Sequence, residues 1–314
     1  MATTEEQVTS PVYGTLADEK KGLAKFWGGI WNFSRHFPVG AVSGAISLGA
    51  VLLAIIAFEG SLLPHDPIKF VGRDRLLPMG STGAASGNFY LLGTDEIGRD
   101  MFSRLLKGAQ LSVFFAIGVS IISIGIGGLI GLGSSYAGGR TDMMVQRVID
   151  AVQTVPFLVL AIAIVSIGSP GIWPGFWAVA ILGIPRPARV IRGSVLSVKQ
   201  NVYVEAAKSL GASDVRVMFR HVLPNVTAPM IVLLSYLLAV AIIIEASLSF
   251  LGIGAQPPTP SWGAMLSGSG QVYFSTHPRL AILPGVSISI IVFATNMFGD
   301  SLRDALDPRL RGST

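Results

Sequence analysis

The run GAQLSVFFAIGVSIISIGIGGLIGLGSSYAGG, residues 108–139, contains no charged side chain. An α-helix needs roughly 20 mostly apolar residues to cross the hydrocarbon core of a bilayer. A strand of a transmembrane barrel would instead alternate apolar and polar residues over about ten positions. Residues 121–132, IISIGIGGLIGL, show no such alternation. We therefore expect spans that are helices and reject a barrel.

The composition of the whole chain also indicates a membrane protein. Its 314 residues are 51% hydrophobic and 13% charged, with a mean hydropathy of +0.61. Ordinary soluble domains carry about 25% charged residues. Gly and Pro at 168–174 divide the long uncharged run 151–185 into two segments. We predict an all-α polytopic membrane protein with six transmembrane helices, at about residues 38–59, 109–136, 148–168, 173–192, 226–250 and 280–299.

The distribution of arginine and lysine orients these helices. Most of the 23 basic residues fall in segments that six spans would place inside, and Arg186, Arg189 and Arg192 would mark the inner interface. We expect both termini in the cytoplasm, and the net charge of +5 reflects this sorting rather than binding of nucleic acid. The predicted parts are a tail at 1–36, a transmembrane domain at 37–311 with an outer loop at 60–108 and a cytoplasmic loop at 186–225, and a short end at 312–314.

Two short helices are expected on the outer side. Thr94 or Asp95 would cap one that contains Met101 and lies at the membrane surface. Ser261 would cap the other, and Trp262 would anchor it at the interface.

The sequence offers no catalytic or metal site. It has no cysteine, its four histidines are scattered, and the absence of a Gly-Lys dipeptide excludes a phosphate-binding loop. Glu245 is the one acidic residue well inside an apolar segment. It is either a lining or gating residue of a pathway or a structural partner for a backbone N–H or an arginine near the outer face, and the sequence leaves both open.

Residues 205–224, EAAKSLGASDVRVMFRHVLP, form a polar island between apolar segments. Residues 194–210 contain no Gly or Pro and predict a helix, which Gly211 would end. Ser213 or Asp214 would cap a second helix. The apolar face of that second helix comprises Val215, Met218, Phe219 and Val222.

Pro224 would end this second helix before the next span. An exposed amphipathic helix of this kind fits a groove on another protein. It also fits a lipid surface, with Arg216 and Arg220 toward the headgroups. The pattern alone does not separate these two interpretations.

The same stretch resembles the cytoplasmic loop of ABC importer permeases. The pattern there is Glu-Ala-Ala, a glycine and Leu-Pro at fixed spacing, found here as 205–207, Gly211 and 223–224, with His221 where isoleucine is usual. FRHVLPN at 219–225 resembles the oligopeptide/dipeptide (peptide/nickel) branch. The likeness covers about 34–311 and is specific to the second permease subunit of such importers.

This resemblance implies a type I ABC importer permease fold in a bacterial or archaeal cytoplasmic membrane. The implied partners are a homologous permease in a heterodimer, two cytoplasmic ATPases and an extracytoplasmic solute-binding protein. ATP and Mg would bind the ATPases, so this chain would hold no cofactor and would not itself be an enzyme. The residues that would couple to the ATPases are Glu205, Ala206, Ala207, Gly211, Ser213, Asp214, Val215, Met218, Phe219, His221, Leu223 and Pro224.

The function implied is that of a permease subunit for import of di- and oligopeptides, which forms half of the translocation pathway. The same machinery carrying nickel or another small solute is an alternative. A secondary transporter is the less favoured class, because it predicts internal repeats and polar, interrupted spans that the sequence does not clearly show.

Overall fold

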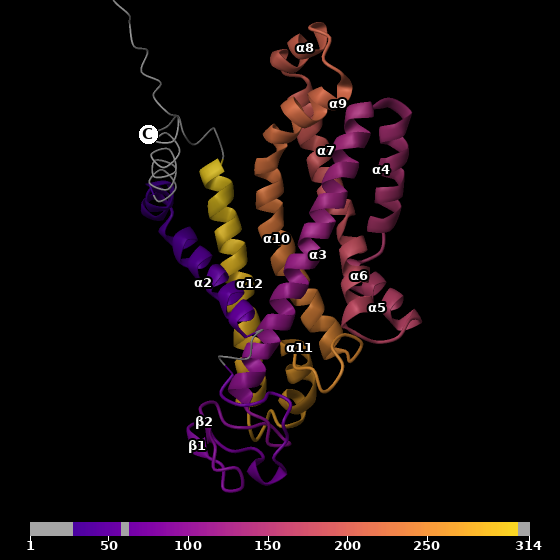
Figure 1. The fold of residues 1–314 in the computed structure, drawn as a ribbon. Coiled ribbons are helices and arrows are strands. Elements are labelled where there is room, and N and C mark those ends of the chain that lie inside the picture. The colour runs from indigo at the N-terminus through magenta and orange to yellow at the C-terminus, as the bar shows by residue number, and fades with distance from the viewer. Residues whose placement is uncertain (1–27, 58–62, 307–314) are drawn as a thin grey trace, which may run out of the picture.

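The computed structural model describes residues 28–57 and 63–306, which form a bundle of long helices (Figure 1). The tail and the C-terminal end that the sequence predicts lie mostly outside the described residues, although residues 28–36 are helical. The α-helices after these are α2 Pro38–Ile56, α3 Met101–Ala137, α4 Gly139–Gln153, α5 Phe157–Ile167, α6 Ile172–Gly183, α7 Pro185–Lys199, α8 Val202–Ser209, α9 Asp214–Val217, α10 Leu223–Phe250, α11 Trp262–Met265 and α12 Arg279–Leu306. The shorter elements are η2 Gly72–Asp74, β1 Ser81–Thr82, β2 Phe89–Tyr90, η3 Met218–Val222 and η4 Leu266–Gly270.

Four helical units among the described residues are long and apolar enough to cross a membrane. They are α2, α3, the unit Asp214–Phe250 and α12. The pair α4 and α5 passes the same test together, but it is bent by 81° at the break between the two helices. The chain is therefore an all-α membrane protein with four to five candidate spans, compared with the six that the sequence predicts.

α3 starts earlier than predicted and runs through the middle of the bundle. The Asp100 carboxylate caps it by accepting hydrogen bonds from the Ser103 amide at 3.0 Å and the Ser103 hydroxyl at 2.6 Å. A separate helix at the outer surface is absent from this segment, because the helix continues unbroken to Ala137. Asp95 was a wrong candidate for the cap, since its carboxylate is bound in the preceding turn by Arg99 at 2.6 Å.

Small residues allow α3 and α7 to approach closely. A Cβ on Gly127 would lie 2.6 Å from the Ile184 carbonyl oxygen, and one on Gly131 would overlap the Ala188 carbonyl oxygen. Glycine at such positions lets two backbones meet without a side chain between them. The contact therefore fixes the place of α7 against α3.

The segment before α3, residues 63–100, folds as a small cap at one end of the bundle, termed the outer cap after the side that the sequence predicts for it. β1 and β2 pair as a short antiparallel hairpin. Asp74 is fully buried, and its carboxylate accepts hydrogen bonds from the amides of Ala85 and Ser86, both at 2.9 Å. Hydrogen bonds from Ser86 and from the Ala85 amide lower the pKa of the Asp74 carboxyl. The carboxylate thus holds the loop after β1 in place.

The connection from α10 to α12 corrects another expectation. Ser261 caps α11 as predicted, because its hydroxyl accepts a hydrogen bond from the Ala264 amide at 3.1 Å. Trp262 is not an interface anchor, since only 3% of it is exposed. Its indole N–H donates to the Leu105 carbonyl at 3.0 Å, so the ring packs against the start of α3.

The two ends of the bundle carry different structures. Figure 1 shows α8 and α9 at one end, and β1, β2 and α11 at the other. The beginning of α2 and the end of α12 lie toward the end that carries α8 and α9. Residues 201–225 and the outer cap therefore lie on opposite sides of the bundle.

Candidate functional site

The helix predicted over residues 194–210 is broken in two. α7 ends at Lys199, and Asn201 has an extended backbone (φ −75°, ψ 140°) before α8 begins. No Gly or Pro marks this break in the sequence. Val204 of α8 is 1% exposed and packs in one cluster with Val195 of α7. We infer that the helix breaks because the break allows Val204 to be buried against α7. The local sequence pattern does not indicate this contact.

Gly211 ends α8 as predicted. Its φ is +81°, in the left-handed region that glycine adopts without strain. The Gly211 amide donates to the Lys208 carbonyl at 2.9 Å, and the Ala212 amide donates to the Ala207 carbonyl at 3.1 Å. These two bonds make a Schellman motif. The motif sets the direction in which the chain leaves α8 and enters α9.

Ser213 and Asp214 start α9, each with a different role. The Ser213 hydroxyl caps the helix by accepting from the Arg216 amide at 3.4 Å. Asp214 instead accepts a hydrogen bond from the Tyr136 hydroxyl at 2.7 Å, and the Lys208 ammonium lies 3.6 Å from the same carboxylate oxygen. The Tyr136 hydroxyl and the Asp214 carboxylate raise the pKa of Lys208. This network ties the start of α9 to the inner end of α3.

Pro224 does not end the helix, contrary to the prediction. Residues 214–250 form one helical unit, and the π-turn η3 ends at Val222, two residues before the proline. A proline inside a regular α-helix removes a hydrogen bond and crowds the carbonyl four residues back. The wider π-turn accommodates the proline, so α9, η3 and α10 form one continuous helical unit.

The predicted apolar face of α9 is divided between two sides. Val217 and Val222 are fully buried, and their five-residue separation is the spacing of a π-turn. Val215 and Phe219 are exposed by 63% and 46%. The prediction assumed an α-helical period throughout and so placed Val222 on the exposed face. The buried cluster beneath comprises Leu132, Tyr136, Ile191, Val195, Val204, Val217, Val222 and Val226, with Met218, Leu223 and Ala207 packed against it.

The end formed by α8 and α9 exposes several large apolar side chains. Val202 and Leu210 are exposed by 81% and 89%, and with Val215 and Phe219 they are termed the α8–α9 patch. Glu205 and Ala206 are also exposed, whereas His221 is half-buried. Large exposed apolar patches are characteristic of interaction surfaces.

Glu245 lies inside the subunit with 1% exposure. Its carboxylate accepts hydrogen bonds from the hydroxyls of Ser112, at 2.6 Å, and Ser249, at 2.8 Å. Ser112 belongs to α3, so the carboxylate connects α10 to α3. Of the two interpretations that the sequence leaves open, this geometry favours the structural partner.

Glu245→Gln should therefore keep transport within about twofold of the unchanged chain, because the amide oxygen still accepts a hydrogen bond. Glu245→Leu should destabilise the subunit by about 1–3 kcal/mol, since two buried hydroxyls lose their acceptor. Thermal unfolding in detergent and substrate uptake measure the two effects. A stable Gln variant that loses uptake of substrates with a free amine would support the gating role instead.

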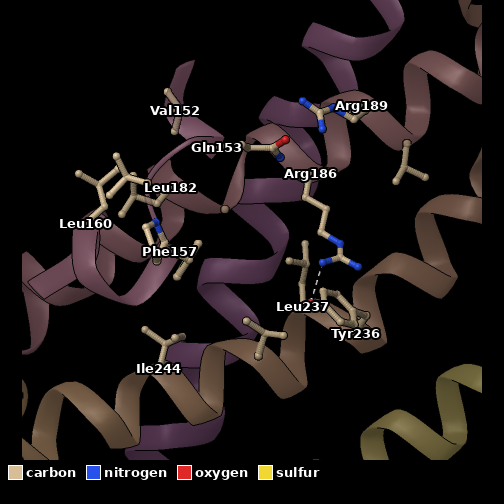
Figure 2. A pocket seen from close by; sticks show the side chains of 15 residues that line it. Val152, Gln153, Phe157, Leu160, Leu182, Arg186, Arg189, Tyr236, Leu237 and Ile244 are labelled. Atoms are coloured by element: carbon tan, nitrogen blue, oxygen red, sulfur yellow. Dashed lines mark hydrogen bonds between the residues drawn. The ribbon is translucent and has the colours of Figure 1, made fainter. Parts of the chain in front are cut away.

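The structure also contains a cavity that the sequence does not indicate. It has a volume of about 610 Å³ and lies where the α4–α5 bend meets α6, α7 and α10 (Figure 2). Its polar lining includes Gln153, Arg186, Arg189 and Tyr236. The Arg186 guanidinium donates to the Tyr236 hydroxyl at 2.8 Å and lies 4.0 Å from that ring's centre. The one feature of the sequence that could have indicated this cavity is Arg186, which lies inside the predicted span 173–192.

Comparison with known proteins identifies the architecture. Residues 123–312 match the family model described as binding-protein-dependent transport system inner membrane component. A solved structure of the MetNI methionine ABC transporter in an inward-facing conformation covers 66% of this chain and 98% of its own, with a TM-score of 0.51 and 17% identity. That likeness concerns the fold alone.

Two curated relatives are similar over nearly their whole length. The glutathione transport system permease protein GsiD of Pectobacterium atrosepticum is 40% identical over 292 residues, which cover 93% of this chain and 94% of the relative. The protein of the same name from Escherichia coli O6:K15:H31 is 38% identical over 281 residues, covering 89% and 90%. In systems of this kind the ATPase lies in partner subunits. The chain therefore belongs to the binding-protein-dependent transport family, as a multi-pass permease subunit of an ABC importer in the inner membrane.

Proposed function

We propose that this chain is the second permease subunit of an importer for glutathione or closely related short peptides. The observation that carries the proposal is the 40% identity to a glutathione permease over 93% of the chain. Glutathione is a tripeptide, so this substrate lies within the peptide class that the sequence predicts. The chain would form half of the pathway, in a heterodimer with a homologous permease.

The proposed topology has six spans with both termini in the cytoplasm. The additional span, which brings the total to six and is the fourth in chain order, would be α6 together with α7. Only Ile184 separates these two helices. The backbone of Ile184 is itself helical, at φ −59° and ψ −43°. α6 and α7 thus continue one another from residue 172 to 199, which is long enough to cross a bilayer. An even number of spans agrees with the start of α2 and the end of α12, which lie toward the same end of the bundle (Figure 1).

The proposed partners are two ATPases on the cytoplasmic side and a solute-binding protein outside. ATP and Mg would bind the ATPases. The α8–α9 patch, with Glu205 and Ala206 beside it in the chain, would enter a groove on an ATPase. This reading is favoured over a lipid surface because α8 lies beyond the ends of α4 and α12 (Figure 1). Since α9 and α10 form one continuous helical unit, displacement of the α8–α9 patch would tilt the span that α10 forms.

Reconstitution of the two permeases and the two ATPases in liposomes, with the solute-binding protein added, tests the function. ATP-dependent accumulation of labelled glutathione, or of a labelled dipeptide, is expected only when the binding protein is present. The absence of ATP-dependent uptake of both solutes would contradict the proposal. Nickel-63 uptake by the same liposomes would point to the alternative cargo.

Phe219→Glu tests the docking patch within the same system. A charge at a contact that becomes buried should weaken ATPase association and reduce uptake at least tenfold. Phe89→Glu, which changes a somewhat more exposed ring (55% against 46%) on the outer cap, should leave ATPase association unchanged. Unchanged association in the Phe219 variant would exclude the patch as the docking site.

A further inference from the structure

Arg186 differs from the other two arginines of α7 in its partner. Arg189 pairs with Asp150 at 2.5 Å, and Arg192 pairs with Asp142 at 2.7 Å. Among the described residues, the side-chain partner of Arg186 is the neutral Tyr236. A guanidinium has five N–H donors, so most of the hydrogen-bonding capacity of Arg186 remains available.

Arg186 is an exposed side chain of α7, and its partner Tyr236 belongs to the long apolar helix α10. Tyr236 stands near the middle of α10, which runs from Leu223 to Phe250. At 1.5 Å per residue it is about 20 Å from either end of the helix. Ionisable residues within spanning segments usually face a cavity or water and mark a substrate or ion pathway.

The cavity beside Arg186 has the size and lining of a small-molecule site. Its volume of about 610 Å³ lies within the range of roughly 300–1,000 Å³ that is usual for ligand pockets. Figure 2 shows Arg186 extending toward Tyr236, with Gln153, the last residue of α4, near the start of the Arg186 side chain. The remaining lining is mainly apolar, from Phe157, Leu160, Leu182, Leu237 and Ile244.

We propose that this cavity is a substrate-binding station in the translocation pathway, in which Arg186 binds a carboxylate of the passing peptide. This inference rests on the proposed function and adds the feature of the substrate that the permease recognises. Arginine matches a carboxylate with two parallel N–H···O bonds. Tyr236 holds the guanidinium from its face and through one N–H, which leaves other donors for the ligand. Glutathione carries two carboxylates and short peptides carry at least one, so each would supply the missing counter-charge.

Equilibrium binding of labelled glutathione tests this site directly. The complex of both permeases and the ATPases would be placed in lipid nanodiscs without the solute-binding protein, so that the permeases' own selectivity is measured. Glutathione diethyl ester, in which both carboxylates are capped, serves as the competitor. Glutathione should bind saturably and at least tenfold more tightly than the ester.

Arg186→Gln should weaken glutathione binding at least tenfold and abolish the preference for the free acid over the ester. Arg186→Lys should keep part of that preference, because it keeps the charge. Arg147→Gln, an exposed arginine of α4 that does not line the cavity, is the matched control and should bind as the unchanged complex does. Loss of binding through misfolding would also affect assembly of the complex, which size-exclusion chromatography measures.

Three results would overturn the proposal: no saturable binding to the unchanged complex, equal affinity for acid and ester, or an Arg186→Gln complex that keeps the preference. Dissociation of the permease pair in Arg186→Gln, with selectivity unchanged, would assign the arginine to a carboxylate of the partner permease. Normal ATP-driven uptake of glutathione together with any of these results would leave the transport function standing and remove only the cavity site. Absence of uptake in liposomes would count against the transport function itself.

Discussion

Gly211→Pro should reduce ATP-driven uptake at least tenfold while the subunit still inserts and assembles with its partner permease. Proline fixes φ near −65°, whereas this position has φ +81°. Proline also lacks the amide hydrogen that Gly211 donates to the Lys208 carbonyl. The Schellman motif would be lost, and α9 would leave α8 in another direction. Uptake into reconstituted liposomes and ATPase activity stimulated by the loaded binding protein measure the uncoupling.

A series at the same position separates backbone geometry from the mere presence of a side chain. Asparagine tolerates the left-handed conformation, so Gly211→Asn should retain most of the uptake. The space around Gly211 is open, with no atom within 4 Å of an added Cβ, so a clash does not account for any loss. If the Pro variant retained as much uptake as the Asn variant, the chain direction set by Gly211 would be unimportant for coupling.

Gly131→Leu is expected to prevent stable folding of the subunit. An added side chain would meet the backbone of Ala188, which has no flexible end that could move aside. α3 and α7 would have to separate, at a cost of about 3 kcal/mol or more. Thermal unfolding in detergent and the yield of folded protein measure this effect.

Gly133→Leu provides the matched control on the same helix. No atom lies within 4 Å of a Cβ at this position, so the same leucine should be accommodated with little loss of stability. Similar destabilisation by both variants would mean that leucine in α3 is harmful in itself and that the close contact with α7 is not the cause.

Features that depend on neighbouring residues in the chain could be predicted from the sequence. The glycine stop at Gly211 and the caps at Ser213 and Ser261 follow from local hydrogen bonds, and the structure confirms all three. The apolar runs likewise predict where the long helices lie, although α3 begins at Met101 rather than at 109. The membrane class also follows from the apolar runs, whereas the permease family follows from the resemblance of residues 205–225 to the loop of such importers.

Features that depend on packing between distant segments could not be predicted in this way. Trp262 is buried because it packs on the start of α3, and Val222 faces inward because a π-turn shifts the helical period. The contact of Arg186 with Tyr236 joins residues that lie fifty positions apart in the chain. A periodic pattern within one segment contains no information about such partners.

The continuous course of α3 has a thermodynamic consequence. Its 37 residues make a rod about 55 Å long, compared with a hydrocarbon core of roughly 30 Å. One end carries Asp100 at the outer cap, and the other carries Tyr136, whose hydroxyl binds Asp214. A displacement at either end has no intervening loop that could absorb it. Coupling free energies are reciprocal, so if docking outside changes nucleotide affinity inside, nucleotide must change the affinity for the docked protein by the same factor.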